Sequence, residues 1–288
     1  MSVQVGDVIR ERWELAEIVG RGGHSVIYRA RDRETGAEVA VKVLHQVAAE
    51  SPELSIRLVR EHRILGRLAG SAAVQVHRLT STPDGVLCLV MELLRGEDLD
   101  EQLARLERTG ERLSVNRLLE LLDPIVETLD LAHEHDIVHR DLKPGNIFVL
   151  ERSGAGQVPV RLLDFGLAKL GSASPLTSAE MVIGSPSYIA PEVWQGNGTK
   201  ADHRMDVYSL GAIVFRALAG RVPFEGESLR AKVQKVIHAP RPSLRALRPD
   251  LPEEIDRWVA QALAVDPARR FSRAGALWTA LGAVLTAG

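Results

Sequence analysis

Eight consecutive residues near the middle of the chain, His139 to Asn146 (HRDLKPGN), bring together a carboxylate, two cations and an amide. The carboxylate, Asp141, is able to accept a proton or orient a hydroxyl, and the cations are able to neutralise negative charge. The amide oxygen of Asn146 is a suitable ligand for a hard metal ion. A second acidic group follows in Asp164-Phe165-Gly166. These residue types predict a divided site for a metal ion and a phosphate.

Both acidic loops adjoin segments with the pattern of a β-strand. An apolar run with helical periodicity ends just before the octet, and the β-type run Ile147 to Leu150 follows it at once. A second apolar run, Val160 to Leu163, leads into the other acidic loop. Asp141 as a helix cap and Asn146 as a turn residue are the alternatives. The position favours catalysis, because rigid loops between regular elements commonly carry catalytic groups.

The N-terminal part of the chain predicts a β-hairpin with a glycine-rich tip. Trp13 to Val19 alternates polar and apolar residues, Gly20 to Ser25 (GRGGHS) interrupts the pattern, and Val26 to Ala30 resumes it. Glycines at such a tip let backbone N–H groups approach a triphosphate and form an anion-binding concavity. A plain hairpin is the alternative, because glycine is also the ordinary turn residue.

Lys42 is a cation within the otherwise apolar strand predicted from Glu38 to Leu44. It is interpreted either as an edge-strand lysine that discourages aggregation or as a ligand for phosphates. The second role needs a carboxylate partner, and Glu61 in the helical stretch Pro52 to Leu68 is available. A local salt bridge on the surface of that helix is the alternative for Glu61.

A change from strand-rich to helix-rich sequence occurs after the buried strand predicted at Leu87 to Met91. We place the domain boundary there, with units 1–92 and 93–288. Backbone groups of Glu92 to Leu94 are candidates to bind an adenine ring at this junction. Asp98 is a candidate for ribose hydroxyls, although a carboxylate at a helix N-terminus needs no ligand to explain it.

The rest of the chain predicts mainly helices. The expected helices are Ser114 to about His135 with Pro124 inside it, a buried central helix from Met205, Ser228 to His238, Pro252 to Ala264, and Ser272 to Thr286. Ser114 is expected to cap the first of them. The segment Leu167 to Ser185 is rich in serine, threonine and glycine and has little periodicity, which predicts a mobile surface segment.

Composition restricts the partners and the compartment. The 36 basic and 38 acidic residues give a net charge of −2, so no electrostatic footprint for nucleic acid or an anionic membrane is expected. The single cysteine, Cys88, cannot form an internal disulfide and lies in an apolar run. The longest weakly polar stretch, Ala274 to Gly288, is shorter than the roughly 20 apolar residues of a membrane span. A cytoplasmic location is expected, for this chain alone or as the catalytic part of a longer protein.

Taken in order, the motifs resemble those of a eukaryotic-type protein kinase catalytic domain over about Val8 to Leu285. They are Gly20-x-Gly22, Val39-Ala40-Val41-Lys42, Glu61, His139 to Asn146, Asp164-Phe165-Gly166, Ala190-Pro191-Glu192, Asp206 and Arg270. The resemblance implies an α+β, bilobed fold: a small antiparallel N-lobe with one key helix, and a larger helical C-lobe. Lys143-Pro144 resembles serine/threonine kinases, and the string Asp206 to Gly211 resembles bacterial ones.

The resemblance implies a role for each matching residue. Asp141 would accept or orient the substrate hydroxyl, Lys143 would neutralise the γ-phosphoryl, and Asn146 with Asp164 would hold Mg²⁺, for which Mn²⁺ is a substitute. Lys42 paired with Glu61 would anchor the α- and β-phosphates. The implied ATP-binding residues are Val19, Gly20, Arg21, Gly22, Gly23, His24, Ser25, Val26, Ala40, Lys42, Glu61, Met91 as gatekeeper, Glu92, Leu94 and Asp98.

Other matching residues have implied structural or regulatory roles. Glu192 with Arg270 would tie the end of the activation segment, the substrate platform, to the helical lobe, and Ser185 would brace Asp141 and Lys143. An arginine before the catalytic aspartate is usually met by a phosphate on the activation segment. We therefore expect autophosphorylation at Thr177, with Ser178 second, protein substrates as partners, and a homodimer as a means of autophosphorylation.

The chain departs from the family pattern in three places that touch no catalytic role, one of them being the extra residues Ser153 to Gly156 in the hairpin between Leu150 and Val160. Ser25 occupies the third glycine position, with His24 before it. The segment Ala69 to Ala73 replaces the usual joint after the Glu61 helix, and a looser joint is expected.

Two other functions compete: a pseudokinase that binds ATP without turnover, and a small-molecule kinase of the aminoglycoside type. The intact catalytic and metal-binding residues disfavour the first, and Lys143-Pro144 with Ala190-Pro191-Glu192 disfavours the second.

Overall fold

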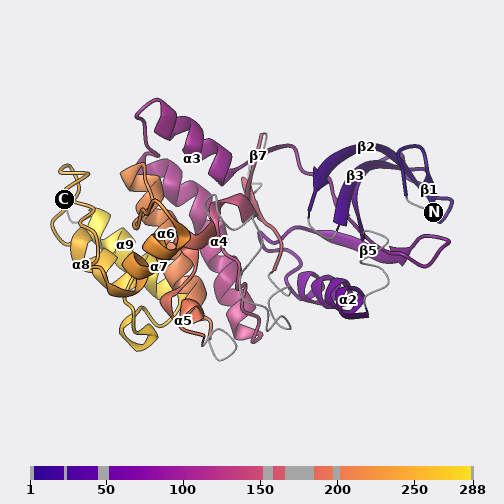
Figure 1. The fold of residues 1–288 in the computed structure, drawn as a ribbon. Coiled ribbons are helices and arrows are strands. Elements are labelled where there is room, and N and C mark those ends of the chain that lie inside the picture. The colour runs from indigo at the N-terminus through magenta and orange to yellow at the C-terminus, as the bar shows by residue number, and fades with distance from the viewer. Residues whose placement is uncertain are drawn as a thin grey trace. The chain divides into compact units, whose positions relative to one another are not determined.

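The computed structural model describes residues 3–22, 25–44, 52–151, 158–165, 185–196 and 202–286. The chain divides into two compact units, Met1–Arg95 and Gly96–Gly288. Figure 1 draws both units and labels many of their helices and strands.

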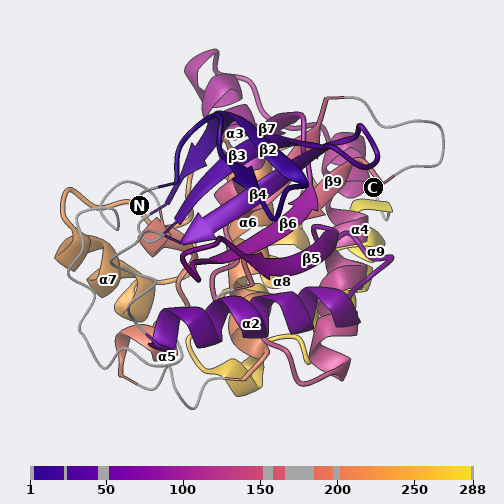
Figure 2. The same ribbon diagram turned by 90° about the vertical axis from the view of Figure 1, so that its right-hand side faces the viewer.

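An antiparallel sheet of six strands forms the first unit, in the order β1-β2-β3-β4-β6-β5. The strands are β1 (Val8–Ile9), β2 (Trp13–Arg21), β3 (Ser25–Asp32), β4 (Glu38–Leu44), β5 (Val76–Ser81) and β6 (Leu87–Glu92). Helix α2 (Pro52–Arg67) packs against β5 and β6, and Figure 2 shows it running past β5.

The core of the first unit comes from apolar residues of the strands, which are buried in consecutive runs on the central strands β4 and β6. Trp13, Leu15, Val41, Cys88 and Leu89 belong to one buried cluster. Burial raises the pKa of the Cys88 thiol to about 12, so this cysteine remains a protonated, buried hydrophobe. The strands predicted around the glycine-rich tip, at Lys42 and at Cys88 are therefore present, whereas the short strands β1 and β5 were not expected.

The joint between α2 and β5 is well packed. Ala72 and Ala73 are buried, and the Ser71 hydroxyl donates to the Leu68 carbonyl at 2.7 Å while it accepts from the Ala73 N–H at 3.1 Å. These contacts correct the expectation of a looser joint. Small residues suffice there because the serine side chain satisfies backbone groups that no regular element would satisfy.

The second unit contains a three-stranded antiparallel sheet, in the order β7-β8-β9, and most of the helices. The described elements are β7 (Gly96–Asp98), α3 (Leu99–Arg108), α4 (Val115–Glu134), η1 (Pro144–Asn146), β8 (Ile147–Leu150), β9 (Val160–Leu162), η4 (Ser185–Tyr188), α5 (Pro191–Trp194), α6 (Arg204–Ala219), α7 (Leu229–His238), α8 (Ile255–Ala262), η5 (Pro267–Arg269) and α9 (Ala274–Thr286).

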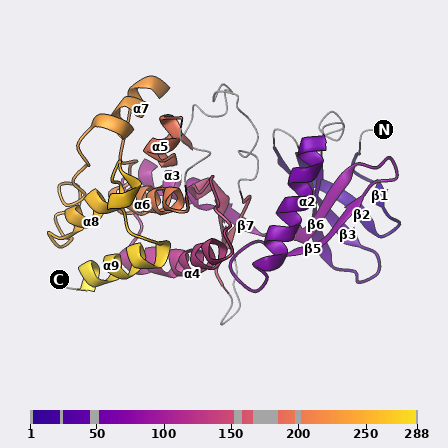
Figure 3. The same cartoon turned by 90° about the horizontal axis from the view of Figure 1, so that it is seen from below.

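Helix α6 is the centre of the second unit, because every residue from Met205 to Ala219 is buried. Helix α4 begins after Ser114, whose side chain caps it as predicted, and buries an apolar stripe. Helix α9 packs against α4, and Figure 3 shows the two side by side. Within the described part of the chain, no helix has both the length and the apolar character needed to cross a bilayer.

Candidate functional site

The loop that contains Asp141 is fixed by Asp206, a buried carboxylate near the start of α6. Its Oδ2 accepts from the His139 N–H at 2.8 Å, and its Oδ1 accepts from the Arg140 N–H at 2.9 Å. The Nε2 of His133 lies 2.9 Å from the same Oδ2. These bonds hold Arg140 in a left-handed conformation, with φ of 65°, which a non-glycine residue adopts at a cost. Asp206 therefore sets the path of the backbone that leads into Asp141.

The side chain of His139 connects this loop to the second acidic loop. Its Nε2 lies 2.9 Å from the Leu163 carbonyl, and its Nδ1 accepts from the Asp141 N–H at 3.3 Å. Such a pattern requires the neutral tautomer with the proton on Nε2. Complete burial lowers the pKa of His139, which favours that neutral form. The ring also packs on Phe165, with centroids 4.8 Å apart.

Asp141, Lys143 and Asn146 are brought together in one turn of chain. The Asn146 amide nitrogen donates to the Asp141 carbonyl at 2.7 Å and to its Oδ2 at 3.3 Å, while the Lys143 Nζ lies 3.1 Å from the same Oδ2. Since the nitrogen of the amide is turned toward Asp141, the oxygen of Asn146 is turned away from it and is the atom suited to a metal ion.

Asp164 lies beside Asn146 because of strand pairing. Ile147 of β8 pairs with Leu162 of β9, and the Leu163 N–H donates to the Asn146 carbonyl at 2.8 Å. Asp164 follows directly, exposed and with a left-handed φ of 43°. Among the described residues, no three His, Cys, Asp or Glu side chains gather as a metal cage. One carboxylate and one amide oxygen nevertheless fit Mg²⁺, which usually keeps water and phosphate as its other ligands.

The first unit places Lys42 next to Glu61. The Lys42 Nζ lies 2.9 Å from the Glu61 Oε1, and each side chain is 15% exposed. Strand β4 pairs with β3 on one side and β6 on the other, so Lys42 is not the edge-strand lysine of the alternative interpretation. The pairing also excludes a purely local salt bridge of α2 as the explanation for Glu61.

The glycine-rich tip joins β2 and β3. Gly20 pairs with Ile27 and Arg21 with Val26, and the Gly22 N–H donates to the Ser25 carbonyl at 2.8 Å. A Cβ on Gly20 would lie 3.4 Å from the Ile27 side chain, which is an ordinary van der Waals contact. Gly23 and His24 lie outside the described residues.

The expected adenine-binding residues lie on strands, except Leu94, which lies between β6 and β7. Ala40 pairs with Met91 across β4 and β6. The Glu92 Oε1 accepts from the Gln75 N–H at 2.7 Å, so this side chain stabilises the chain before β5. Leu94 is half-buried and Val19 is exposed.

Asp98 caps helix α3. Its Oδ1 accepts from the Glu101 N–H at 2.9 Å, and burial raises the pKa of this carboxyl. The cap explains Asp98 without a ligand, as the sequence analysis allowed, and a role toward ribose stays a prediction.

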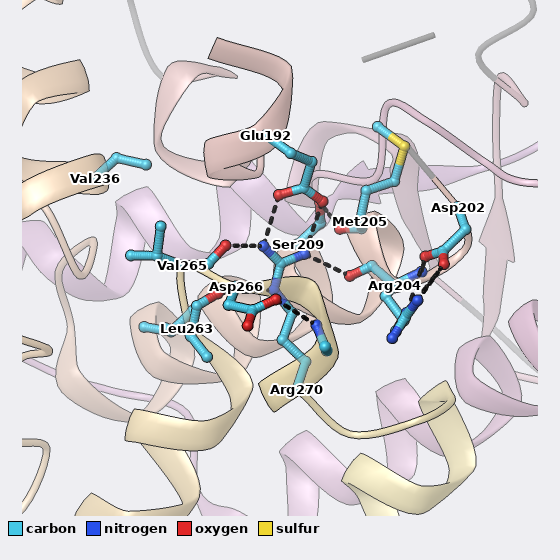
Figure 4. Close-up of polar contacts among 12 residues, drawn as sticks. Glu192, Asp202, Arg204, Met205, Ser209, Val236, Leu263, Val265, Asp266 and Arg270 are labelled. Carbon is cyan, nitrogen blue, oxygen red and sulfur yellow. Dashed lines mark hydrogen bonds and ion pairs between the residues drawn. The ribbon is translucent and has the colours of Figure 1, made fainter. Parts of the chain in front are cut away.

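Glu192 and Arg270 form a buried pair, drawn in Figure 4. Arg270 Nη1 lies 2.8 Å from Glu192 Oε1, and Nη2 lies 2.6 Å from Oε2. The remaining donors of the guanidinium reach the carbonyls of Ala264, Arg204 and Val265. The predicted phosphosites Thr177 and Ser178 and the side chain of Ser185 lie outside the described residues.

His133 contacts the site but is not among the site residues that the sequence predicted. It belongs with Asp206, although it stands in the last turn of α4 and 73 positions before its partner. The available signal was a histidine at the C-terminal end of an apolar helix, which by itself is an ordinary helix-end residue.

Comparison with known proteins gives the family. Residues 13–280 match the family described as "Protein kinase domain". The serine/threonine-protein kinase PknA of Mycobacterium tuberculosis is 37% identical over 99% of this chain and 64% of PknA, so the chain spans less than two thirds of that relative.

Solved structures agree. The crystal structure of the Mycobacterium tuberculosis PknI kinase domain superposes with a TM-score of 0.71 at 25% identity, covering 98% of this chain and 99% of that one. The structure of Rad53 in complex with AMP-PNP has a TM-score of 0.70 at 26% identity, covering 92% of this chain and 64% of that one. The chain therefore belongs to the protein kinase family, with the kinase domain extending over nearly all of its length.

Proposed function

We propose that this domain transfers the γ-phosphoryl group of ATP to serine and threonine hydroxyls of proteins. The observation that carries the proposal is the arrangement of Asp141, with Lys143 and Asn146 bonded to its carboxylate in a loop fixed by Asp206. Phosphoryl transfer depends on positioning and charge neutralisation, and this loop supplies both. The name of PknA, a serine/threonine-protein kinase, supports the choice of acceptor.

Four residues of the second unit have a task in that reaction. Asp141 accepts or orients the proton of the substrate hydroxyl, and Lys143 neutralises charge on the transferred group. Asn146 and Asp164 supply oxygen atoms for Mg²⁺ or, as a substitute, Mn²⁺. When bound, the metal ion offsets the negative charge of the phosphates.

In this proposal each implied ATP-binding residue contacts a particular part of the nucleotide. Lys42, kept in place by Glu61, binds the α- and β-phosphates, and the backbone of Gly20 to Ser25 covers them. Ala40, Met91, Glu92 and Leu94, with Val19 and Val26, contact the adenine, and Asp98 the ribose. The Rad53 relative supports nucleotide binding because it was solved with AMP-PNP, an ATP analogue.

Transfer of radiolabel from ATP to a generic protein substrate tests the reaction. Asp141→Asn should lower transfer at least about 100-fold, the usual contribution of a positioned base. Asp136→Asn is the matched control, because Asp136 is exposed and asparagine tolerates its left-handed φ of 58°. Equal labelling by wild type and Asp141→Asn would exclude the mechanism. ATP binding without transfer would identify a pseudokinase, and transfer to an aminoglycoside but to no protein a small-molecule kinase.

Regulation by autophosphorylation at Thr177, with Ser178 second and a homodimer as the reacting species, is the second part of the proposal. Arg140 supports it: within the described ranges, no carboxylate or carbonyl pairs with its guanidinium. A phosphate on the segment after Gly166 would supply such a partner. Mass spectrometry after incubation with Mg-ATP should find phosphate at Thr177. Phosphate found only outside residues 170–185 would contradict this regulation.

A further inference from the structure

Arg216 is a buried cation in α6 that the reaction outlined above does not use. Its guanidinium donates from Nε to Glu107 Oε1 at 2.7 Å and from Nη2 to Glu107 Oε2 at 3.0 Å. Its Nη1 donates to Asp100 Oδ1 and to the Tyr188 hydroxyl, the latter at 2.9 Å. Helix α3 thus supplies two carboxylates, and η4 supplies one phenol. These four contacts all reach partners on elements other than α6.

Stability alone does not explain this network. A buried ion pair rarely stabilises a fold more than well-packed apolar residues of the same volume, because both charges lose their hydration. Asp100 remains about half exposed, at 47%, so this carboxylate does not need Arg216 as a partner to stay solvated. The network instead fixes geometry, because the planar guanidinium holds the groups that it binds in defined positions.

Tyr188 is the residue whose position the Arg216 guanidinium fixes. Besides the phenol bond to Arg216, the Tyr188 carbonyl accepts from the Ser209 hydroxyl of α6 at 2.7 Å. Four residues further on, Glu192 is bound by Arg270. Residues 188–192 are therefore fixed at three points: α6 binds the Tyr188 side chain and carbonyl, and Arg270 binds the Glu192 carboxylate.

We propose that Arg216, oriented by Asp100 and Glu107, is a positioning residue for the protein substrate. It fixes the phenol of Tyr188 and through it the segment 185–192, on which the acceptor peptide binds. This inference rests on the proposed kinase function, because that function makes the segment a substrate platform. The phenol is neutral and accepts one charge-assisted hydrogen bond, so its loss should affect peptide binding and leave ATP binding unchanged.

Tyr188→Phe is the sharpest test, because it removes one hydroxyl and leaves the Arg216 carboxylate pairs intact. We expect kcat/KM for a peptide substrate to fall about tenfold, the equivalent of one charge-assisted hydrogen bond. The KM for ATP and the melting temperature should stay near wild type. Tyr208→Phe is the matched control: its hydroxyl is also buried in this unit and has no hydrogen-bond partner among the described residues.

A second variant checks the direction of the effect. Arg216→Gln should lower peptide kcat/KM at least as much as Tyr188→Phe, and the double variant should be no worse than Arg216→Gln alone, because both changes break the same bond. Arg105→Gln is its control. Arg105 lies on α3, the helix that supplies Asp100 and Glu107, and the change removes only its exposed ion pair with Glu97.

The outcomes separate this inference from the proposed function. Failure of the wild type to label any protein would contradict the function itself. An active wild type with Tyr188→Phe indistinguishable from Tyr208→Phe would overturn the positioning role alone. An equal rise in KM for ATP and for peptide, or additive effects in the double variant, would also overturn it, because a general loosening of the unit would then be responsible.

Discussion

Two glutamate ion pairs, one in each unit, differ in how completely their cation is enclosed. Lys42 contacts Glu61 at 2.9 Å, and both side chains are 15% exposed. Arg270 is fully buried, and its Nη1 and Nη2 both reach Glu192. The remaining guanidinium donors bind backbone carbonyls. The first cation is a point charge on a flexible stem, and the second is a planar fork with every donor used.

This difference teaches what each pair is suited to do. A lysine that keeps some exposure and has rotatable donors is able to bind a phosphate while it stays near its carboxylate. An arginine whose donors all bind protein atoms has none left for a ligand, so the Arg270 pair is suited to fastening the chain near Glu192 permanently. Stability should therefore depend strongly on the second pair and weakly on the first.

The largest expected effect is the loss of Glu192. In Glu192→Gln a fully buried guanidinium loses the carboxylate that is its one charged partner among the described residues, which should lower the free energy of unfolding by about 3–5 kcal/mol. Denaturant unfolding measures this loss. Asp202→Asn, which breaks a more exposed pair with Arg204, is the control and should cost at most about 1 kcal/mol. A loss for Glu192→Gln as small as that of the control would remove the contrast between the two units.

A smaller effect on stability is expected from the Arg12–Asp32 pair, which has the fork geometry of an arginine pair but keeps part of the arginine side chain exposed. Arg12 binds Asp32 with Nε at 3.0 Å and Nη2 at 2.7 Å, and the guanidinium remains 27% exposed. The hydrogen bonds from Arg12 lower the pKa of Asp32 from 3.8 to about 2. The folded protein therefore binds fewer protons here than the unfolded chain, so this stabilisation is present above pH 4 and is lost as pH falls toward 2.

Acid titration of stability in wild type and Asp32→Asn checks this. The two curves should differ at pH 5 and converge as pH approaches 2. Curves that stay parallel over that interval would mean that an arginine fork with a partly exposed guanidinium contributes no proton-linked stability.

The smallest effect on stability is expected for Lys42→Met. Methionine retains the apolar stem in the buried strand, and the lost ion pair is partly exposed, so unfolding should become easier by only about 1 kcal/mol. Phosphoryl transfer, in contrast, should be lost. Parallel measurements of unfolding and of label transfer test this separation, with Arg29→Met, at another charged position of the same sheet, as the control. A loss of stability like that of Glu192→Gln would show that the lysine pair is also a fastening.

Much of this arrangement could be predicted because its determinants are local. The octet around Asp141, the apolar strands beside it and the Ser114 cap each depend on neighbouring residues, and they appear where the sequence indicated. Strand β5 was missed because His77 and Arg78 interrupt its apolar pattern, and its pairing with β6 is irregular. Strand β7 is three residues long and too short to show alternation.

The Arg216 network could not be predicted for a different reason. Its carboxylates lie 109 and 116 positions away in the sequence, and nothing in helical periodicity pairs them. Because α6 is buried on all sides, a polar residue within it gives no indication of which neighbour it meets.

The left-handed backbone at Arg140 and Asp164 restricts which substitutions the two loops accept. Valine, isoleucine and threonine are poorly compatible with a positive φ, whereas glycine and asparagine adopt it readily. In a saturation library selected only for folded protein, with no selection for activity, β-branched residues should be depleted at both positions. Substitutions at these two positions must therefore be compatible with a positive φ as well as with phosphoryl transfer.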